Sequence, residues 1–240
     1  MKETRINKYL SEVGFCSRRA ADKLIEQNRV TINGKVPEMG TKIIEGDIVK
    51  VDGESINKPK AKPVYLAFHK PVGIVCTTDT RVEKNNIIDF INFPQRIFPI
   101  GRLDKPSEGL IFMTNDGDIV NKILRARNGH EKEYIVTVNK PITETFLQKM
   151  RNGLPILDTV TRKCKVEQLG EKQFKIILTQ GLNRQIRRMC EYLDYHVKKL
   201  KRVRIMNVTL DVPIGKWRDL TPNELKEINR LVSDSSKTHF

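Results

Sequence analysis

An aspartate, Asp104, stands between two glycine-flanked turns and directly before an apolar segment, in GRLDKPSEGLIFMTNDGD at residues 101–118. Pro106 biases the backbone of Lys105 away from the helical region, so this stretch should form a loop at the edge of a sheet. A carboxylate on a constrained loop can act on a bound substrate as a nucleophile or as a base. The same pattern is also typical of a plain turn or capping residue. The motif by itself leaves both interpretations open.

A tyrosine and an arginine further along the chain are the next candidates. In EKEYIVTV, alternation with a period of two places Tyr134 on one face with Val136 and Val138, a pattern that is also typical of core packing. In NRQIRRMCEYL, apolar and basic residues form two stripes at helical spacing, and the basic stripe includes Arg187. A buried arginine there would need a carboxylate partner, because an uncompensated interior charge is costly.

These segments resemble the RsuA-like branch of the RNA pseudouridine synthases, which modify ribosomal RNA. The resemblance covers nearly the whole chain and rests on GRLDKPSEGLIFMTN, NKILRARNGHEKEYIVTV and QGLNRQIRRMCEYLDYHVKKLKRVRIMNV. HKPVG at residues 69–73 resembles a further motif, which commonly begins with Asn where this chain has His69. We expect His69 to be structural or solvent-facing, and Lys70 either to contact phosphate or to form the turn beside Pro71. Within the branch, the similarity is greatest to members that act on large-subunit (23S) ribosomal RNA.

The resemblance implies a chemical role for each candidate. In this isomerisation the bond from ribose to the uracil nitrogen breaks, the ring turns, and carbon 5 attaches instead. Asp104 would act at the glycosidic centre, as a nucleophile or as a base and electrostatic partner. Tyr134 would stack on the flipped uracil and help to remove the carbon 5 proton, while Arg187 would pair with Asp104 and keep it ionised. The reaction needs no cofactor, so none is expected.

The charge of the chain points to a polyanionic partner. The formal net charge is +15, with 44 lysines and arginines against 29 acids, and residues 181–204 alone hold eight lysines and arginines against two acids. Such a surplus exceeds what solubility requires and favours nucleic acid as the partner. The predicted RNA-binding residues are Arg5, Lys8, Arg18, Arg19, Lys23, Arg102, Arg184, Arg188, Lys198, Lys199 and Arg202.

The sequence divides into two domains of the α+β class. Residues 1–57 predict a small domain with a helix at 6–12 and a second helix, capped by Ser17, that runs to about Gln27. This part resembles a small RNA-binding domain named after a ribosomal small-subunit protein. Residues 58–63, KPKAKP, predict a linker, residues 64–232 the larger domain, and residues 233–240 a flexible tail.

The larger domain should contain a mixed, mainly antiparallel sheet, because many of its connections are too short for a helical crossover. Thr221, Pro222 and Glu224 indicate the start of a final helix through a capping box. Further helices are expected at 86–92, 117–127, 142–150 and 183–193. Strands are expected at 65–69, 73–77, 109–114, 132–138, 164–169, 174–180 and 196–210.

Other classes of function fit the sequence less well. The apolar runs are too short to span a bilayer and the N-terminal segment lacks the pattern of a secretory signal, so we expect a cytoplasmic monomer without a membrane partner. The four cysteines, Cys16, Cys76, Cys164 and Cys190, lie at no metal-binding spacing, which favours reduced thiols and no metal site. Two alternatives to modification of ribosomal RNA stay open: the same isomerisation on a transfer RNA, and a non-catalytic RNA-binding factor in ribosome assembly.

Overall fold

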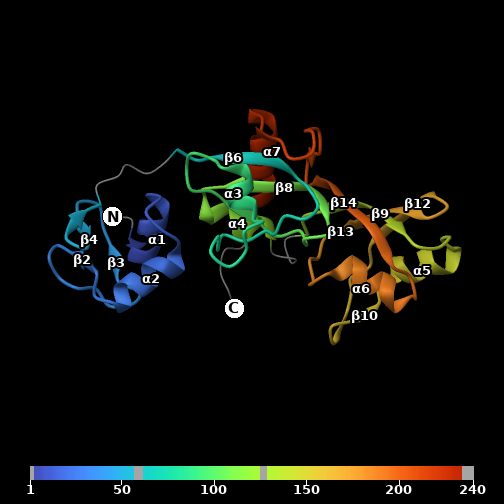
Figure 1. Cartoon of the computed structure of the whole chain (residues 1–240), viewed down its shortest axis with the longest axis horizontal. Coiled ribbons are helices and arrows are strands. Elements are labelled where there is room, and N and C mark those ends of the chain that lie inside the picture. Colours follow the sequence, from blue (N-terminus) through green and yellow to red (C-terminus); the bar gives the residue numbers. More distant parts are fainter. Residues whose placement is uncertain (1–2, 57–61, 125–128, 234–240) are drawn as a thin grey trace. The chain divides into compact units, whose positions relative to one another are not determined.

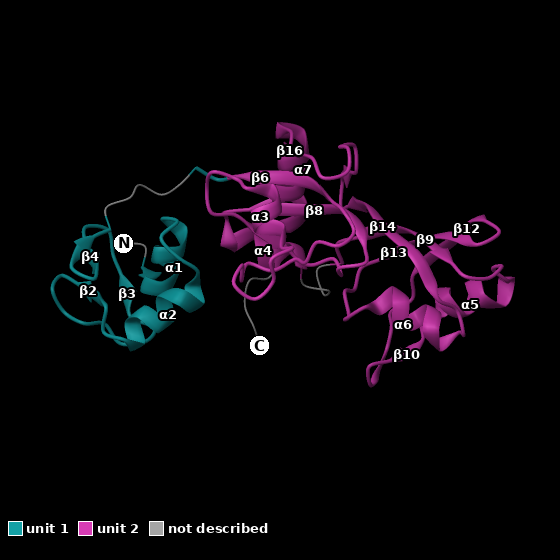
Figure 2. Cartoon of the chain, in the orientation of Figure 1, with its two compact units in different colours: residues 1–63 teal, residues 64–240 magenta. Residues whose placement is uncertain are grey.

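The computed structural model describes residues 3–56, 62–124 and 129–233. The chain forms two compact units, residues 1–63 and residues 64–240 (Figure 2). The division follows Pro63, the last residue of the predicted linker, of which residues 58–61 lie outside the described part. Residues 234–240 of the predicted tail also lie outside it. In the described residues, no helix is both long enough and apolar enough to cross a membrane.

The small unit is built from two helices and short strands around its own core. Helix α1 has the predicted bounds, and Ser17 caps α2 by accepting a hydrogen bond from the Ala20 amide at 3.1 Å. Both helices bury their apolar face against the strands, with Leu10 and Ile25 packed against Val49. The elements are β1 (Thr4–Arg5), α1 (Ile6–Glu12), α2 (Arg18–Glu26), β2 (Val30–Ile32), β3 (Lys42–Ile43), β4 (Val49–Val51) and β5 (Glu54–Ser55).

The larger unit is organised around one long mixed sheet (Figure 1). The strand order is β12-β13-β9-β14-β8-β6-β16, with β7 paired to β8 and β15 paired to β14; β14 and β8 run parallel and the other pairs antiparallel. The α+β class with a mainly antiparallel sheet is thus confirmed. The strands are β6 (Tyr65–Lys70), β7 (Phe98–Ile100), β8 (Glu108–Thr114), β9 (Lys132–Val138), β12 (Lys165–Gly170), β13 (Gln173–Leu178), β14 (Val197–Ile205), β15 (Val208–Thr209) and β16 (Trp217–Asp219).

Helices cover both faces of this sheet. Helix α3 packs on one face of β6 and β8, where Ile87 meets Phe68 and Ile111, while α4 and α7 pack on the other face of these strands. Helices α5 and α6 cover β9 and β13. The helices are α3 (Ile87–Ile91), α4 (Gly117–Leu124), α5 (Glu144–Asn152), α6 (Gln185–Tyr192) and α7 (Pro222–Val232), and a hairpin of β10 (Pro155–Ile156) and β11 (Thr159–Val160) follows α5.

Two predicted strands differ from the structure. Residues 73–77 form no strand: after the turn at Gly73, Val75 makes an isolated bridge to Asn86, because its backbone bonds to the segment that enters α3 and not to the sheet. The predicted strand at 196–210 is broken at Met206, whose positive φ of 52° turns the chain between β14 and β15. Residues 125–127 of the predicted helix at 117–127 lie outside the described residues.

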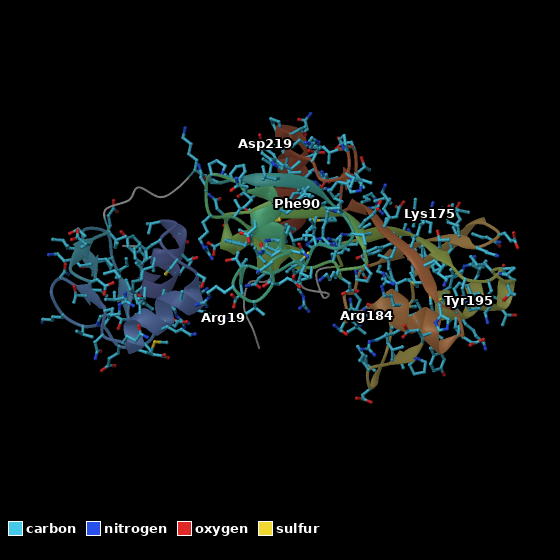
Figure 3. All side chains as sticks on the ribbon, viewed as in Figure 1. Arg19, Phe90, Lys175, Arg184, Tyr195 and Asp219 are labelled. Atoms are coloured by element: carbon cyan, nitrogen blue, oxygen red, sulfur yellow. The ribbon has the colours of Figure 1, made fainter. Side chains whose placement is uncertain are left out.

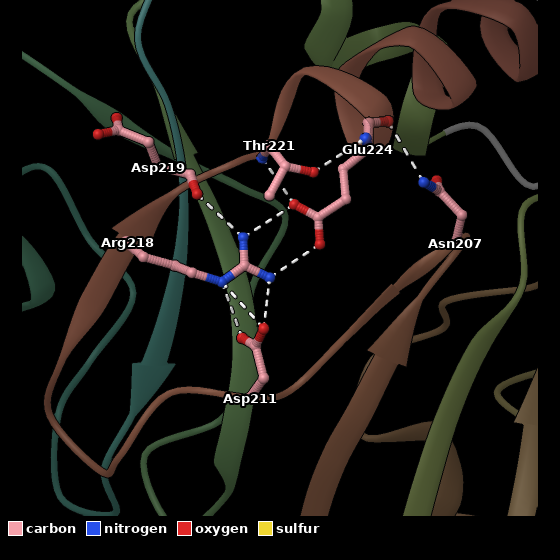
Figure 4. Close-up of polar contacts among 6 residues, drawn as sticks. All are labelled: Asn207, Asp211, Arg218, Asp219, Thr221 and Glu224. Carbon is pink, nitrogen blue, oxygen red and sulfur yellow. Dashed lines mark hydrogen bonds and ion pairs between the residues drawn. The ribbon is translucent and has the colours of Figure 1, made fainter.

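An ion-pair cluster fastens the last helix to the sheet (Figure 4). Arg218 on β16 donates from Nη2 to Asp211 Oδ2 and to Glu224 Oε1, both at 2.8 Å. The predicted capping box is present, since Thr221 Oγ1 accepts from the Glu224 amide and Glu224 Oε2 accepts from the Thr221 amide. Asn207 adds a bond to the Glu224 carbonyl at 3.3 Å. The cluster therefore serves the fold and lies apart from the cavity described below.

Candidate active site

A cavity of about 380 Å³ lies over the centre of the sheet in the larger unit. Three strands supply its wall through Leu178 of β13, Lys132 and Tyr134 of β9, and Leu200 and Arg202 of β14. The rest of the lining comes from residues between 101 and 107 before β8, from residues 180–187, which lead into α6, and from Leu124 of α4. The volume is in the range of small-ligand sites, roughly 300–1,000 Å³.

Asp104 lies on the loop between β7 and β8, as its sequence context predicts. The loop is tight: the Ser107 amide donates to the Asp104 carbonyl at 2.9 Å, and the Gly73 amide donates to the Lys105 carbonyl at 2.8 Å. Leu103 is buried beneath it and holds the loop against the core. The Asp104 side chain is 36% exposed and faces the cavity, so its carboxylate is accessible to a ligand.

Lys70 supports the same loop from below, which corrects the expectation of a phosphate contact or a simple turn residue. Its side chain is fully buried, and Nζ donates to the carbonyls of Ser107 and Pro71, each at 2.8 Å. Burial lowers the pKa of Lys70. His69 is also buried, with Nδ1 2.9 Å from the Val212 carbonyl oxygen, so the structural reading of His69 is correct and the solvent-facing one is wrong.

Arg187 reaches the Asp104 loop from α6. Its side chain is 9% exposed, and Nη2 donates to Ser107 Oγ at 3.0 Å and to the Pro106 carbonyl at 3.2 Å. Nε lies 4.0 Å from Asp104 Oδ2, the ion pair that the family resemblance implied. Burial lowers the pKa of Arg187, the charge of Arg184 lowers it further, and Asp104 opposes both effects. The buried charge is thus fixed by the loop and partly neutralised by Asp104.

Tyr134 forms part of the cavity wall. It is half-buried on the face of β9 that also carries Val136 and Val138, as the alternation predicts. Its side chain contacts two apolar clusters of the core, and the guanidinium carbon of Arg202 lies 6.0 Å from the ring centre. Asp104, Tyr134 and Arg187 come from a loop, a strand and a helix that are distant in sequence, yet all three line one cavity.

The predicted RNA-binding residues of the larger unit fall into two groups. Arg102, Arg184 and Arg202 line the cavity, whereas Arg188, Lys198 and Lys199 lie outside its lining. Arg184, labelled in Figure 3, is exposed at the start of α6 with a positive φ of 48°. Arg202 differs from the expectation of a basic surface residue: it is only 3% exposed, and Nε donates to the Leu110 carbonyl at 2.6 Å.

In the small unit, Lys8 lies on α1, Arg18, Arg19 and Lys23 lie on α2, and Arg5 ends β1 just before α1. Arg5, Arg18, Arg19 and Lys23 are exposed. Lys8 is half-buried and lies 3.5 Å from Glu12 one turn later. Four of the five side chains are thus open to a ligand of this unit.

Two residues of the cavity were not predicted from the sequence. Ser107 accepts the Arg187 hydrogen bond, and Lys132 lines the wall beside Tyr134. Burial and the charge of Arg202 lower the pKa of Lys132 to about 8. The period of two that placed Tyr134 also puts Lys132 on its face, and this signal could have revealed it. In the described ranges, no group of three His, Cys, Asp or Glu residues could hold a metal ion.

Comparisons with known proteins agree with this fold. The family model for RNA pseudouridylate synthase matches residues 64–192, and the model for the S4 domain matches residues 4–36. The chain therefore belongs to the RNA pseudouridylate synthase family, in its RsuA-like branch, and is an enzyme that isomerises uridine in RNA.

Individual relatives extend over nearly the whole chain. A dual-specificity RNA pseudouridine synthase RluF of Salmonella typhi is 59% identical over 235 residues, which cover 97% of this chain and 81% of the relative. The ribosomal large subunit pseudouridine synthase B of Bacillus subtilis is 35% identical, with 98% of this chain and 99% of the relative covered. A crystal structure of a pseudouridylate synthase matches with a TM-score of 0.68 and 28% identity, over 95% of this chain and 99% of that one.

Proposed function

We propose that this enzyme converts a specific uridine of large-subunit (23S) ribosomal RNA to pseudouridine, with the reaction centred on Asp104. The observation that carries this proposal is the arrangement of Asp104, Tyr134 and Arg187 around one cavity. Asp104 acts at the anomeric carbon of the flipped nucleotide, where charge develops as the glycosidic bond breaks. Tyr134 supplies a flat ring for the uracil, and Arg187 keeps the aspartate ionised and oriented.

The target base has to leave its stack to reach Asp104. Extruding a base costs roughly a few kcal/mol in a duplex and less in a loop. The cavity can repay this cost through stacking on Tyr134 and through contact with the apolar side chains of Leu178 and Leu200. A uridine in a loop or beside a mismatch is therefore the favoured substrate.

The basic residues outside the catalytic set are proposed to position the RNA. Arg102 and Arg184 line the cavity, and Lys198 and Lys199 are exposed on β14. Contacts of this kind with phosphate fix the register of the RNA without reading its bases. In the S4 domain, the exposed Arg5, Arg18, Arg19 and Lys23, together with Lys8, provide a second set of phosphate contacts. Arg188 donates to the Asn183 carbonyl and side chain, and Arg202 is buried, so both contribute less to docking.

The names of the relatives support the choice of RNA. The Bacillus subtilis relative is a ribosomal large subunit enzyme, which favours large-subunit RNA as the target. The Salmonella typhi relative is a dual-specificity enzyme, which favours a second RNA substrate for this chain as well. We assign that second role to a transfer RNA. The enzyme is proposed to act as a monomer in the cytoplasm, where both RNAs are found.

The test of this function is a map of pseudouridines across ribosomal and transfer RNA from cells with and without the gene. We expect one site in 23S RNA to disappear on deletion, and a site in a transfer RNA to disappear with it. Return of both sites on re-expression of the intact chain completes the assignment. A map that does not change in 23S RNA would refute the ribosomal target.

The same assay with Asp104→Asn tests the site. This change keeps the size of the side chain and removes its charge, so we expect no pseudouridine at either position and RNA affinity within a few-fold of the wild type. The matched control is Asp158→Asn, because Asp158 is exposed on the β10–β11 hairpin and its φ of 56° suits asparagine equally well. Unchanged turnover in Asp104→Asn would exclude the proposed chemistry.

A further inference from the structure

The cavity holds more positive charge than its carboxylate can neutralise. Within the described part of its lining, Asp104 is the acid, and the cations are Arg102, Lys132, Arg184, Arg187 and Arg202. Arg187 is held by the Asp104 loop, and Arg102 and Arg184 are exposed to solvent. Lys132 and Arg202 have no acidic side chain within ion-pair distance among residues 3–56, 62–124 and 129–233. The described part of the fold therefore supplies no counter-charge to these two groups.

The sheet places both charges beside Tyr134. Arg202 is the direct partner of Tyr134 across β9 and β14, and Lys132 precedes Tyr134 by two residues, which puts it on the same face of β9. Arg202 Nη2 is buried and has no hydrogen-bond partner in the part of the chain that the structure describes. A base stacked on the Tyr134 ring would therefore lie next to a lysine and a buried guanidinium.

These two neighbouring cations destabilise the folded protein. Removing a cation from water is costly, and here the two neighbouring groups repel each other. The lowered pKa of Lys132 reflects both effects. A destabilising charge that lines a cavity indicates a functional residue, since a neutral side chain at position 132 would stabilise the protein.

We propose that Lys132 is a further catalytic residue, which donates a hydrogen bond to a carbonyl oxygen of the uracil while that base carries negative charge. Arg202 adds a fixed positive charge next to it. This inference rests on the proposed placement of the nucleotide by Asp104, Tyr134 and Arg187.

The isomerisation provides such an anion. When the bond between C1′ and N1 breaks, both electrons stay with the uracil, whose negative charge spreads over N1 and the two carbonyl oxygens. After the ring has turned, C5 gives an electron pair to C1′, the C5 proton leaves, and N1 regains a proton, so no atom or electron is gained or lost overall. A positive charge at the carbonyl oxygens stabilises the anion more than the neutral base and therefore lowers the barrier.

Lys132 must be protonated for this role, so its surroundings decide the pH range in which it works. Its own face carries Tyr134, and the neighbouring strands contribute the apolar Leu178 and Leu200. His130, whose pKa Lys132 helps to lower, lies just before it. Arg202 on β14 is the charged group that acts on it, and the other charged groups of the cavity lining are Arg102 and Asp104 on the loop before β8 and Arg184 and Arg187 at the start of α6.

The experiment compares Lys132→Met with Lys132→Arg on the RNA substrate found by the pseudouridine map. Methionine keeps the length of the side chain without its charge, and arginine keeps the charge. The matched control is Lys175→Met, because Lys175 on β13 (Figure 3) lies outside the cavity lining and pairs with Glu167 at 2.6 Å. The measured quantities are the RNA dissociation constant and the single-turnover rate constant between about pH 6 and 10, with enzyme in excess over RNA and both below the dissociation constant.

We expect Lys132→Met to lower the rate constant about 100-fold, the effect of losing one donor to a developing anion, while RNA affinity changes less than about threefold. Lys132→Arg should recover most of the rate. At concentrations below the dissociation constant, the pH dependence of the rate reports the pKa values of groups in the free enzyme. The wild-type rate should fall above about pH 8, and the fall in Lys132→Arg should begin at higher pH because the guanidinium stays protonated.

Two results would overturn the proposal. One is a rate for Lys132→Met within about threefold of the Lys175→Met control, well below the effect of a lost anion donor. The other is an identical alkaline fall for the wild type and Lys132→Arg, a comparison that does not depend on Lys132→Met. Both differ from failure of the proposed function, in which Asp104→Asn would retain activity on the same RNA.

Discussion

Arg187 Nε lies 4.0 Å from Asp104 Oδ2, while Nη2 of the same guanidinium is bonded to Ser107 Oγ at 3.0 Å and to the Pro106 carbonyl at 3.2 Å. The arginine is thus held mainly by the loop that carries the aspartate. Nε is buried and has no hydrogen-bond partner within the described residues. One guanidinium therefore fixes the loop with one nitrogen and presents another toward the carboxylate.

Replacing Arg187 by lysine tests this division of roles. A lysine keeps the charge but cannot hold the loop and face Asp104 together, because its donors lie on a single nitrogen. We expect Arg187→Lys to lower the rate of pseudouridine formation by about 100-fold, with RNA affinity nearly unchanged. Arg230→Lys, an exposed residue on α7, is the control. Full activity of Arg187→Lys in single-turnover assays would show that charge alone is sufficient.

Gly109 is a position where any side chain should destabilise the fold. It pairs with Arg202 in the parallel contact between β8 and β14, has a φ of 121°, and a Cβ there would lie 2.3 Å from the Arg202 carbonyl oxygen. We expect Gly109→Ala to lower the free energy of unfolding by at least about 2 kcal/mol, because both the backbone strain and the clash oppose it. Urea denaturation followed by circular dichroism measures this change.

The control for that change is Gly117→Ala in the first turn of α4. No atom lies within 4 Å of a Cβ there, and its φ is not positive. Alanine favours the helix by up to about 1 kcal/mol, so this variant should be as stable as the wild type or slightly more stable. Equal losses of stability in the two variants would show that the close approach of Gly109 and Arg202 does not cause the destabilisation.

Lys132 should make the stability of the protein depend on pH. Its pKa falls from 10.5 to about 8 in the folded protein, so the unfolded chain binds more protons between these values. Stability therefore rises as the pH increases from about 8 to 10.5, and the cost of the charged lysine, about 3 kcal/mol as an order of magnitude, is fully present below pH 8.

Lys132→Met removes that cost. We expect the variant to be more stable than the wild type at pH 7 and the difference to shrink steadily toward pH 10. Chemical denaturation of both proteins at several pH values gives the difference directly, and it cancels the titration of other groups. A difference that stays constant over this range would contradict the assignment of the lowered pKa to Lys132.

Arg218 should contribute measurably to the attachment of α7. Arg218→Met removes paired hydrogen bonds to Asp211 and Glu224, and we expect a loss of about 2 kcal/mol in the free energy of unfolding. Arg230→Met is the matched control, since its ion pair with Glu227 is exposed and should be worth less than about 1 kcal/mol. Similar losses of stability in the two variants would show that the cluster in Figure 4 contributes no more than an exposed ion pair.

Much of the local structure follows from the sequence alone. Ser17 caps α2, and Thr221 with Glu224 forms the capping box of α7, because these interactions involve residues only three positions apart. The alternation in residues 132–138 likewise predicted β9 with its observed bounds. Where a pattern repeats over neighbouring residues, the backbone conformation is decided by short-range chemistry.

The sequence also indicated Asp104, Tyr134 and Arg187 as candidates for the chemistry, whereas only the tertiary structure decided how they are grouped and that Lys132 lies beside them. Residues 73–77 look like a strand but form their hydrogen bonds with the segment before α3, because pairing depends on which segment lies alongside. Arg202 looks like one more residue of a basic surface, yet its register opposite Tyr134 buries it in the cavity wall. Lys132 acquires its low pKa only because folding removes it from water and places Arg202 nearby. The burial and the electrostatic interactions of a side chain depend on contacts between distant parts of the chain. They are therefore decided only when the strands of the sheet pair.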